Sequence, residues 1–239
     1  ASLIASRIAE ISVLESASLI SSALQQFKLD ASQSLPVLDS LNTLSNKYKV
    51  TTDDLLQSIS RTGSVFAENN GRLNELAAIT AVVSETTSRT GPEIGNALKT
   101  ISSNLSRIEI KDTLFSELGI SLEDIEGNAK SLGTVILELD AAMKTLSETE
   151  QRELVVKIAG VRQANILTAA IRDSQKAVEA EISSVSQSNS AMTELGEQAG
   201  TLVAALKRLK GIFQQVSNSA GPAIISVVNK LLALIELIL

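Results

Sequence analysis

The residues of this chain that could do chemistry are carboxylates, hydroxyls and amines, because the sequence contains no histidine and no cysteine. The commonest general base and metal ligand is therefore missing, and so is the thiolate nucleophile. The densest acidic run consists of Glu117, Glu123, Asp124 and Glu126. It lacks the Asp-x-Asp-x-Asp-Gly spacing of a calcium loop, so helix capping and solvation explain it better than a metal site.

Two further patterns invite comparison with catalytic or ligand-binding motifs. Glu126 and Asp140 could supply the carboxylate pair of a glycoside hydrolase. Such enzymes need aromatic platforms, however, and this chain has one tyrosine and no tryptophan. Gly91-x-x-x-Gly95 lacks the Gly-Lys-Ser/Thr ending of a phosphate-binding loop and fits a helix start instead. We therefore predict no catalytic residues, no cofactor and no metal site, and we expect that the protein is not an enzyme.

The elements that carry these residues are expected to be helices throughout, which makes the predicted fold class all-α. The 239-residue chain is 44% apolar but only 2% aromatic, so small and aliphatic side chains supply its core. Such side chains allow close helix packing but bury less area than aromatics. No period-2 alternation predicts a strand longer than three residues. The net charge of −6 argues against direct nucleic-acid binding, which needs a basic face.

The clearest helix start lies in the segment 89–127. Thr90 and Glu93 have the spacing of a capping box, in which a hydroxyl and a carboxylate satisfy free backbone N–H groups. Pro92 falls in the first turn, where its missing N–H costs little. Steps of four and three then predict one apolar helix face, formed by Ile94, Leu98, Ile101, Leu105 and Ile108.

Helix ends in and beyond the same segment are marked by glycine. Leu118-Gly119-Ile120 should close a short helix, with Gly119 at a positive φ. Ser121 and Asp124 have the spacing to cap one further turn, which Gly127 would end. Gly160 should likewise separate two helices at a positive φ or a close backbone contact.

Caps, turns and periodicity divide the rest of the chain into helices. We expect N-terminal amphipathic helices in residues 1–48, a helical core with glycine turns in residues 49–160, and long helices with an apolar C-terminal segment in residues 161–239. The individual helices are expected over residues 3–28, from Pro36 to Lys47, from Thr51 to the Asn69-Asn70-Gly71 turn, from Leu73 to Thr87, from Ser131 to Leu146, from Ser147 to Ile158, and over residues 162–217.

The last of these helices carries a heptad pattern, which is typical of a coiled-coil seam. The seam residues are Leu195, Ala199, Leu202, Leu206, Leu209, Phe213, Val216 and Ala220. A similar stripe precedes them and consists of Val178, Ile182, Val185, Asn189 and Met192. The step from Met192 to Leu195 breaks the alternation and predicts a kink near residues 188–192. An intramolecular bundle and an intermolecular coiled coil both stay open.

The most apolar segment runs from Pro222 to Leu239. It is long enough to consider as a membrane span, but burying Lys230 and Glu236 in lipid would each cost about 2.5–3.5 kcal/mol. We therefore favour a helix whose apolar face is completed by other copies of the chain, in a number that the seam residues do not fix. Both ends of the sequence look cut from a longer polypeptide.

Several of these motifs occur in an order that resembles the core region of phage tail tape-measure proteins. The resemblance covers roughly residues 50–225, and Asn96 stands where the family pattern has threonine. The matching motifs are Asn96-Ala97-Leu98-Lys99 after a glycine turn, Leu118-Gly119-Ile120, the acidic stretch from Asp124 to Gly127, and Ile158-Ala159-Gly160 before a long helix.

The resemblance implies a structural component of a phage or prophage-derived tail, which sets tail length during assembly and is released when DNA is delivered. It places the protein in the tail interior of the virion after assembly in the host cytoplasm. It implies other copies of the chain as partners, with three parallel copies preferred, together with the tail tube and the tail tip or baseplate proteins. It leaves a contact with the host membrane during ejection open.

The glycine turns limit what this segment can do as a ruler. A continuous helix of all 239 residues would reach about 360 Å at 1.5 Å per residue. The turns at Gly71, Gly91, Gly119 and Gly160 forbid such a helix, so we expect a compact region at one end of the ruler. The alternative function is that of a helical membrane-active, pore-forming protein or a signalling protein. The short helices of residues 50–160 argue against a signalling rod.

Overall fold

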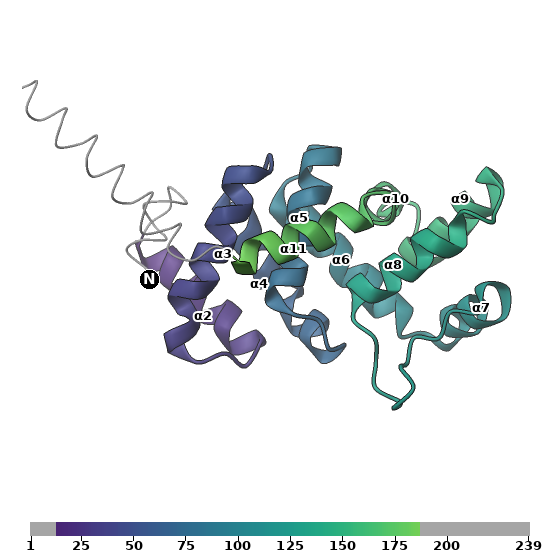
Figure 1. The fold of residues 1–239 in the computed structure, drawn as a ribbon, viewed down its shortest axis with the longest axis horizontal. Helices are drawn as coiled ribbons and strands as arrows, with labels where there is room; N and C mark the ends of the chain where they lie inside the picture. The colour runs from purple at the N-terminus through teal and green to yellow at the C-terminus, as the bar shows by residue number, and fades with distance from the viewer. Residues whose placement is uncertain (1–12, 187–239) are drawn as a thin grey trace, which may run out of the picture. The chain divides into compact units, whose positions relative to one another are not determined.

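A computed structural model describes residues 13–186, which form helices joined by turns and, between residues 118 and 132, by a longer loop (Figure 1). Within this range there is no β-strand, and one isolated bridge joins Glu123 to Ala129. The helices are α2 (Val13–Gln26), the 3-10 turn η1 (Ala31–Gln33), α3 (Ser34–Lys47), α4 (Thr52–Glu68), α5 (Leu73–Thr87), α6 (Gly91–Leu105), α7 (Ile108–Leu118), α8 (Leu132–Met143), α9 (Glu148–Ala159), α10 (Ala164–Arg172) and α11 (Ser174–Ser186). The all-α prediction is confirmed for these residues.

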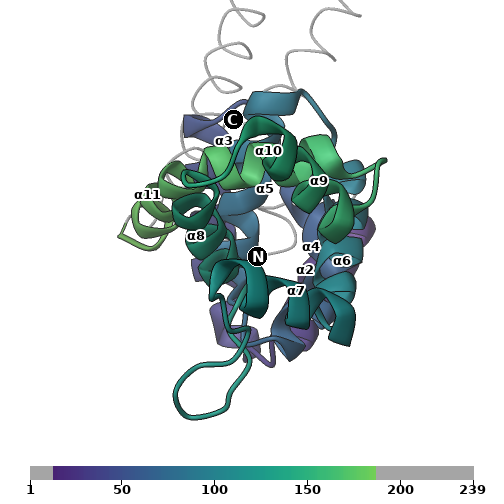
Figure 2. The same ribbon diagram turned by 90° about the vertical axis from the view of Figure 1, so that its right-hand side faces the viewer.

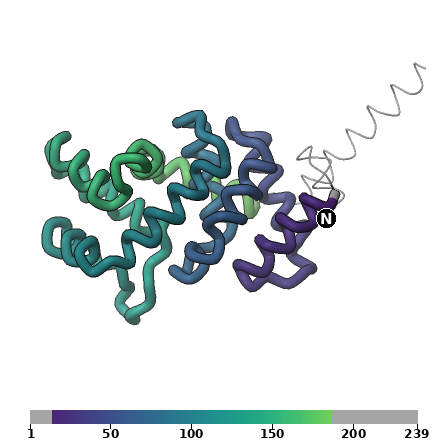
Figure 3. The backbone as a smooth tube through the Cα atoms, turned by 180° about the vertical axis from the view of Figure 1, so that it is seen from behind, coloured from purple at the N-terminus to yellow at the C-terminus, as the bar shows by residue number. Residues whose placement is uncertain are grey.

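The central helix of this part of the chain is α5, which packs against α3, α4, α6, α8, α10 and α11. Every residue from Glu75 to Ser84 is buried. Such burial on all sides suits a helix that is rich in alanine, valine and threonine, because small side chains let neighbours approach from every direction. The chain advances from α2 and α3 at one end to α7, α8 and α9 at the other (Figure 3). From there α11 returns along α5 to α3 (Figure 1).

The most extensive helix–helix contact joins α4 to α6, and two glycines make it possible. A Cβ on Gly91 would overlap the backbone of Asp54, and one on Gly95 would lie 2.9 Å from the Cα of Ser58. The Gly91 N–H donates to Asp54 Oδ1 at 2.7 Å, and the Thr62 hydroxyl donates to the Gly95 carbonyl. Gly91-x-x-x-Gly95 is thus a helix start, as predicted, and also the surface on which α6 meets α4.

The predicted capping signals are confirmed at the start of α6. The Thr90 N–H donates to Glu93 Oε2 at 3.0 Å, and Pro92 lies in the first turn. The hydrogen bond from Thr90 and a further one from Arg89 hold the pKa of Glu93 below its ordinary value. The same reciprocal arrangement opens α9 at Ser147, as the spacing predicted.

The predicted glycine ends are also confirmed. Gly119 closes α7 with φ at +68°, and Gly160 closes α9 with φ at +74°. At the end of α7 the Ile120 N–H donates to the Leu114 carbonyl and the Gly119 N–H to the Phe115 carbonyl, both at 3.0 Å. The bond from the Gly119 N–H to the Phe115 carbonyl is that of the αL cap, which satisfies a carbonyl that the helix itself leaves free.

Replacing either glycine with alanine should destabilise the protein through backbone strain alone, because a Cβ at either position would meet nothing within 4 Å. Gly119→Ala should cost roughly 1 kcal/mol, since Gly119 is left-handed helical. Gly160→Ala should cost more, roughly 1–3 kcal/mol, because its ψ of 161° lies in a region that is essentially restricted to glycine. Urea unfolding measures both losses. Gly119→Asn is the control and should lose less than Gly119→Ala, and no loss at either glycine would contradict the assignment.

Two predictions made within residues 89–127 are wrong. Ile108 does not continue the face of α6, because α6 ends at Leu105 and Ile108 starts α7 with 73% of its surface exposed. Residues 121–127 form no helical turn. The Asp124 carboxylate instead accepts the N–H groups of Glu126 and Asn128, both at 2.9 Å. These bonds compete with helix formation and shape a loop that projects from the helices (Figure 1, Figure 2).

The prediction of a single helix over residues 162–217 is also wrong for residues 162–186, which are the part of it that the structure describes. The chain makes two helices there, α10 and α11, which are separated at Asp173. Asp173 has φ at −103° and ψ at 21°, and the Thr86 hydroxyl donates to its carboxylate at 2.7 Å. The sequence has no glycine or proline at this break. We therefore attribute the break to the hydrogen bond between Asp173 and Thr86 of α5.

The remaining boundaries differ from prediction by a few residues. The α3 helix starts two residues before Pro36, and α8 ends at Met143 rather than Leu146. Residues 3–12, the seam over residues 195–220, the kink near residues 188–192 and the apolar segment over residues 222–239 lie outside the described range. Contacts group residues 1–191 and 192–239 into two compact units. The division of the chain at residues 48 and 160 stays a prediction.

Candidate interaction surface

The acidic residues that the sequence singled out are engaged separately in the structure. Glu117 pairs with Lys157 at 4.0 Å, and Glu123 pairs with Lys111 at 3.7 Å. Asp124 accepts N–H groups of its own loop, and these hydrogen bonds, that of Asn128 foremost, lower its pKa. Among residues 13–186, no group of three acidic side chains is placed to hold a metal ion.

The two carboxylates considered as a hydrolase pair also have different neighbours. Asp140 pairs with Lys144 one turn further along α8, with Nζ and Oδ2 at 2.9 Å. Glu126 lies exposed in the loop between α7 and α8, where the Asn128 side chain approaches it at 3.5 Å. These acidic residues therefore form no common site. The candidate interaction surface lies elsewhere, around α11.

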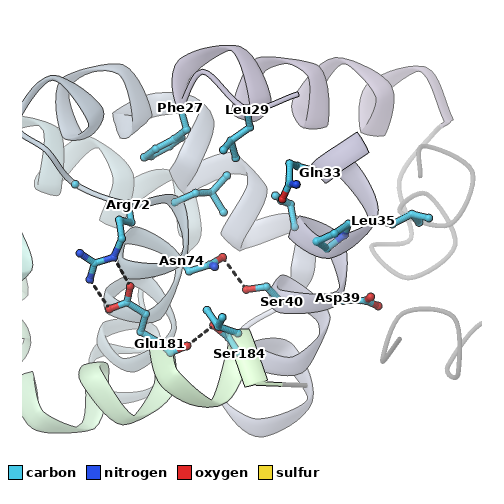
Figure 4. Close-up of a pocket in the computed structure, with 15 residues that line it drawn as sticks. Phe27, Leu29, Gln33, Leu35, Asp39, Ser40, Arg72, Asn74, Glu181 and Ser184 are labelled. Carbon is cyan, nitrogen blue, oxygen red and sulfur yellow. Dashed lines mark hydrogen bonds and ion pairs between the residues drawn. The ribbon is translucent and has the colours of Figure 1, made fainter. Parts of the chain in front are cut away.

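Two ion pairs attach α11 to the N-terminal and C-terminal ends of α5. Arg72, at the start of α5, forms a two-pronged pair with Glu181, with nitrogen–oxygen distances of 2.9 and 3.1 Å (Figure 4). Lys176 pairs with Glu85, near the end of α5, at 2.5 Å. The hydrogen bonds to these carboxylates raise the pKa of both Arg72 and Lys176. Both basic groups therefore stay charged throughout the neutral range.

A tyrosine ring and a hydroxyl add to this attachment. Tyr48, at the end of α3, is buried, and the amino groups of Lys47 and Lys176 lie 5.6 and 5.5 Å from its ring centre. These distances suit cation–π attraction. The bond from Thr86 to Asp173 holds the first turn of the same helix. Polar contacts thus reach α11 along most of its length.

The side of α11 that faces the helices is made of small residues, whereas two of its three large apolar side chains are exposed. The buried residues of α11 are Ser174, Ala180 and Ser184. Ile182 is 64% exposed and Val185 is 62% exposed, and Val178 is half-buried. We call Val178, Ile182 and Val185 the α11 stripe. Val178 lies beside Ile79 of α5 and Ile136 of α8. The core therefore leaves Ile182 and Val185 largely exposed, although they are among the most hydrophobic residues of the helix.

A groove with a volume of about 800 Å³ adjoins the end of the stripe (Figure 4). Phe27 and Leu29 reach into it from the end of α2, opposite Glu181 and Ser184 of α11. Most of its lining is apolar and comes from four parts of the chain: Phe27, Leu29, Leu35, Pro36, Val37, Leu73 and Val185. Because Val185 belongs to both, the stripe and the groove form one continuous apolar surface.

The polar groups of the groove are largely bonded to one another. The Ser40 hydroxyl donates to Asn74 Oδ1 at 2.8 Å, and Arg72 is paired with Glu181. The Ser184 hydroxyl donates to the Glu181 carbonyl at 2.8 Å. A bound partner would therefore gain mainly by covering apolar surface, which favours an apolar partner over a charged one.

The sequence located only half of this surface. Its periodicity identified Val178, Ile182 and Val185 as one stripe, which the structure places together. It did not predict the groove or the Arg72–Glu181 pair. The two residues of that pair are 109 positions apart in the sequence, and local spacing contains no information about such a contact.

None of the helices within residues 13–186 is long and apolar enough to cross a membrane by itself. The pair formed by α9 and α10 meets the test of length and composition only when the two are taken together, and a bend of 117° separates them.

The fold and the surface define an all-helical protein with an exposed apolar helix face that continues into an apolar groove. The chain belongs to the family described as phage-related minor tail proteins, whose model matches residues 1–160. It is therefore a phage tail protein, and the phage-tail part of the resemblance seen in the sequence is confirmed. The match includes the whole of the segment 89–127. No solved structure matches the chain.

Proposed function

We propose that this chain is part of a tape-measure protein, the tail component that sets tail length during assembly and leaves the tail when DNA is delivered. The family match over residues 1–160 is the observation that supports this proposal most directly. The order of the motifs at residues 96–99, 118–120 and 158–160 adds the finer assignment by resemblance. In this role the chain has no catalytic function and binds no nucleic acid directly.

The proposed place of residues 13–186 is a compact region at one end of the ruler, within the tail interior. The longest described helix, α4, has 17 residues, which corresponds to about 25 Å. Helices of that length folded against one another cannot span a tail. The proposed partners are other copies of the chain, preferably three in parallel, the tail tube, and the tip or baseplate proteins. A contact with the host membrane during ejection stays open.

The ruler role predicts that added helical sequence lengthens the tail. An insertion of about 70 helix-forming residues into the gene for this chain, outside residues 13–186, should lengthen tails by roughly 105 Å at 1.5 Å per residue. Electron microscopy of phage particles measures the change. As a matched control, the same number of residues is inserted at Gly127, in the exposed loop between α7 and α8. That insertion should leave the length unchanged, because it extends only a side loop.

The two insertions together decide the question. A length change with the first insertion alone supports the ruler role. If neither insertion changes the tail length in particles that contain the altered chain, the ruler role is contradicted. The chain would then be a minor tail protein that does not set tail length.

A further inference from the structure

We propose that the exposed face of α7 and the loop after it form a docking surface for a different tail protein, one that offers an apolar pocket bordered by lysine and arginine. We call Ile108, Asp112, Phe115, Ile125 and Glu126 the α7–loop surface. The inference rests on the proposed partnership with other tail proteins, and it adds where one of them binds and what chemistry it has. It does not depend on the ruler role.

The first observation is that α7 exposes large apolar side chains to solvent. Ile108, Asp112 and Phe115 follow steps of four and three in the sequence, so they share one face of the helix. Ile108 is 73% exposed and Phe115 is 67% exposed. Phe115 is also the one exposed aromatic residue within residues 13–186. Exposed aromatic side chains are typical of the positions that contribute most to the binding energy of an interface.

The second observation is that the loop between α7 and α8 holds Ile125 in solvent in a fixed shape. Ile125 is fully exposed. The Asp124 carboxylate before it accepts backbone N–H groups from beyond it in the loop. The Asn70 side chain, just after α4, donates to the Ala129 carbonyl at 2.9 Å and anchors the loop to the helices. Because the loop is ordered before any partner arrives, binding costs little further conformational entropy.

A hollow of about 200 Å³ connects the exposed face of α7 to the loop. Asp112 and Phe115 line it from α7, and Ile120 and Glu123 line it from the loop. Ile125 follows two residues after Glu123. The surface therefore combines protruding apolar side chains with a recess, which is the relief that lets two protein surfaces interdigitate.

The charge of this segment indicates the kind of partner. Residues 107–127 contain six acidic and two basic residues, a net charge of −4 in a chain whose net charge is −6. Within the described part of the chain, the acidic groups of the segment that form ion pairs are Glu117, with Lys157, and Glu123, with Lys111. The remaining carboxylates repel anionic lipids and nucleic acids, and they attract a protein with lysine or arginine around its apolar contact.

A second copy of this chain does not offer that complement. Its own α7–loop surface carries the same negative charge. The groove beside α11 is the other large apolar surface of the described residues, and the basic side chain in its lining, Arg72, is already paired with Glu181. The charges therefore favour a different protein as the occupant.

A photo-crosslinking amino acid at residue 125 tests the contact in assembled phage particles. Ile125 is replaced with p-benzoylphenylalanine, which should leave folding unchanged because the side chain is fully exposed. The matched control is the same replacement at Gln25, which is exposed on α2 at the other end of the described helices. After irradiation, residue 125 should link to a protein other than this chain with a several-fold higher yield than residue 25. Mass spectrometry of the linked peptide should find lysine or arginine beside the contact.

Charge reversal tests the chemistry of the partner separately. Asp112→Lys combined with Glu126→Lys, in the chain that carries the crosslinker at residue 125, should lower the adduct yield per incorporated chain several-fold. Asp30→Lys combined with Glu179→Lys is the matched control, because it changes the net charge equally at two exposed residues outside the surface. It should leave the yield unchanged. Circular dichroism melting of the purified chains checks that they fold alike.

Each outcome supports or overturns the proposal. Adducts from residue 125 that contain only this chain overturn it, and so does a yield no greater than that from residue 25. A yield that the two charge reversals change equally also overturns it, because the partner would then not be selected by the acidic surface. Exclusion of the Asp112→Lys and Glu126→Lys chain from particles that accept the control chain supports it.

The same experiment separates this inference from the proposed function. If neither residue 125 nor residue 25 links to another protein, the proposed partnership with other tail proteins fails together with the inference. If residue 25 alone links to one, only the inference fails. Tail length is not measured in any arm, so the ruler role is decided independently by the insertions.

Discussion

Gly91→Ala should destabilise the protein by roughly 2–4 kcal/mol, which is among the largest effects expected of a single methyl group. The added Cβ would overlap the backbone of Asp54, which cannot move aside as a flexible side chain would. Displacing α6 would also lengthen the 2.7 Å bond from the Gly91 N–H to Asp54. Urea unfolding followed by circular dichroism measures the loss.

Asn96→Ala is the matched control for this prediction. Asn96 lies in the same helix as Gly91 but is exposed, so alanine there should change stability by less than about 0.5 kcal/mol and in the favourable direction. Equal stability of Gly91→Ala and the wild type would show that α4 and α6 can separate freely. In that case the glycines would matter only as a helix start.

The contrast between the two roles of Gly91-x-x-x-Gly95 shows what local sequence can and cannot predict. A helix start depends on residues within one turn, and Thr90, Pro92 and Glu93 are all adjacent to it. The glycine ends at Gly119 and Gly160 are local in the same sense. The contact with Asp54 joins two helices that are separated by the whole of α5, so the spacing of the glycines alone does not reveal which helix they meet.

The wrong predictions have the same origin. The periodic pattern predicted that the apolar face of α6 extends to Ile108 and that one helix continues through Asp173. The helices break at both places, and neither break contains glycine or proline. At the first break the Asn104 side chain donates to the Ile158 carbonyl at 2.8 Å, and at the second Asp173 is bonded to Thr86. Both bonds come from helices distant in the sequence, and a periodic pattern contains no information about them.

The candidate surface was predictable to the extent that it is periodic. The steps between Val178, Ile182 and Val185 predicted that these residues share a face. They did not predict that Ile182 and Val185 would stay exposed, because that outcome depends on Ser174 and Ala180 filling the space against α5. The groove, which is assembled from four parts of the chain, had no signal in the sequence.

Glu75→Ala should produce the second large loss, roughly 2–4 kcal/mol, because it would leave two backbone donors unsatisfied. Glu75 is only 5% exposed. Its Oε2 accepts the Arg72 N–H at 3.1 Å, which caps the first turn of α5, and its Oε1 accepts the Gly133 N–H at 2.8 Å, at the start of α8. One carboxylate therefore joins the first turns of two helices, where its charge also suits both helix dipoles.

The matched control for Glu75 is Glu93, which occupies the same position in the first turn of α6 but whose side chain is 46% exposed. Glu93→Ala removes the local cap and no link to another helix, so its loss of stability should be clearly smaller. Glu75→Gln should fall between Glu75→Ala and the wild type, because the amide retains one acceptor oxygen but places donors against an N–H group. Urea unfolding of the three variants measures these differences. Equal losses for Glu75→Ala and Glu93→Ala would mean that the bond to Gly133 contributes nothing, and that α5 and α8 are held together by their apolar contacts alone.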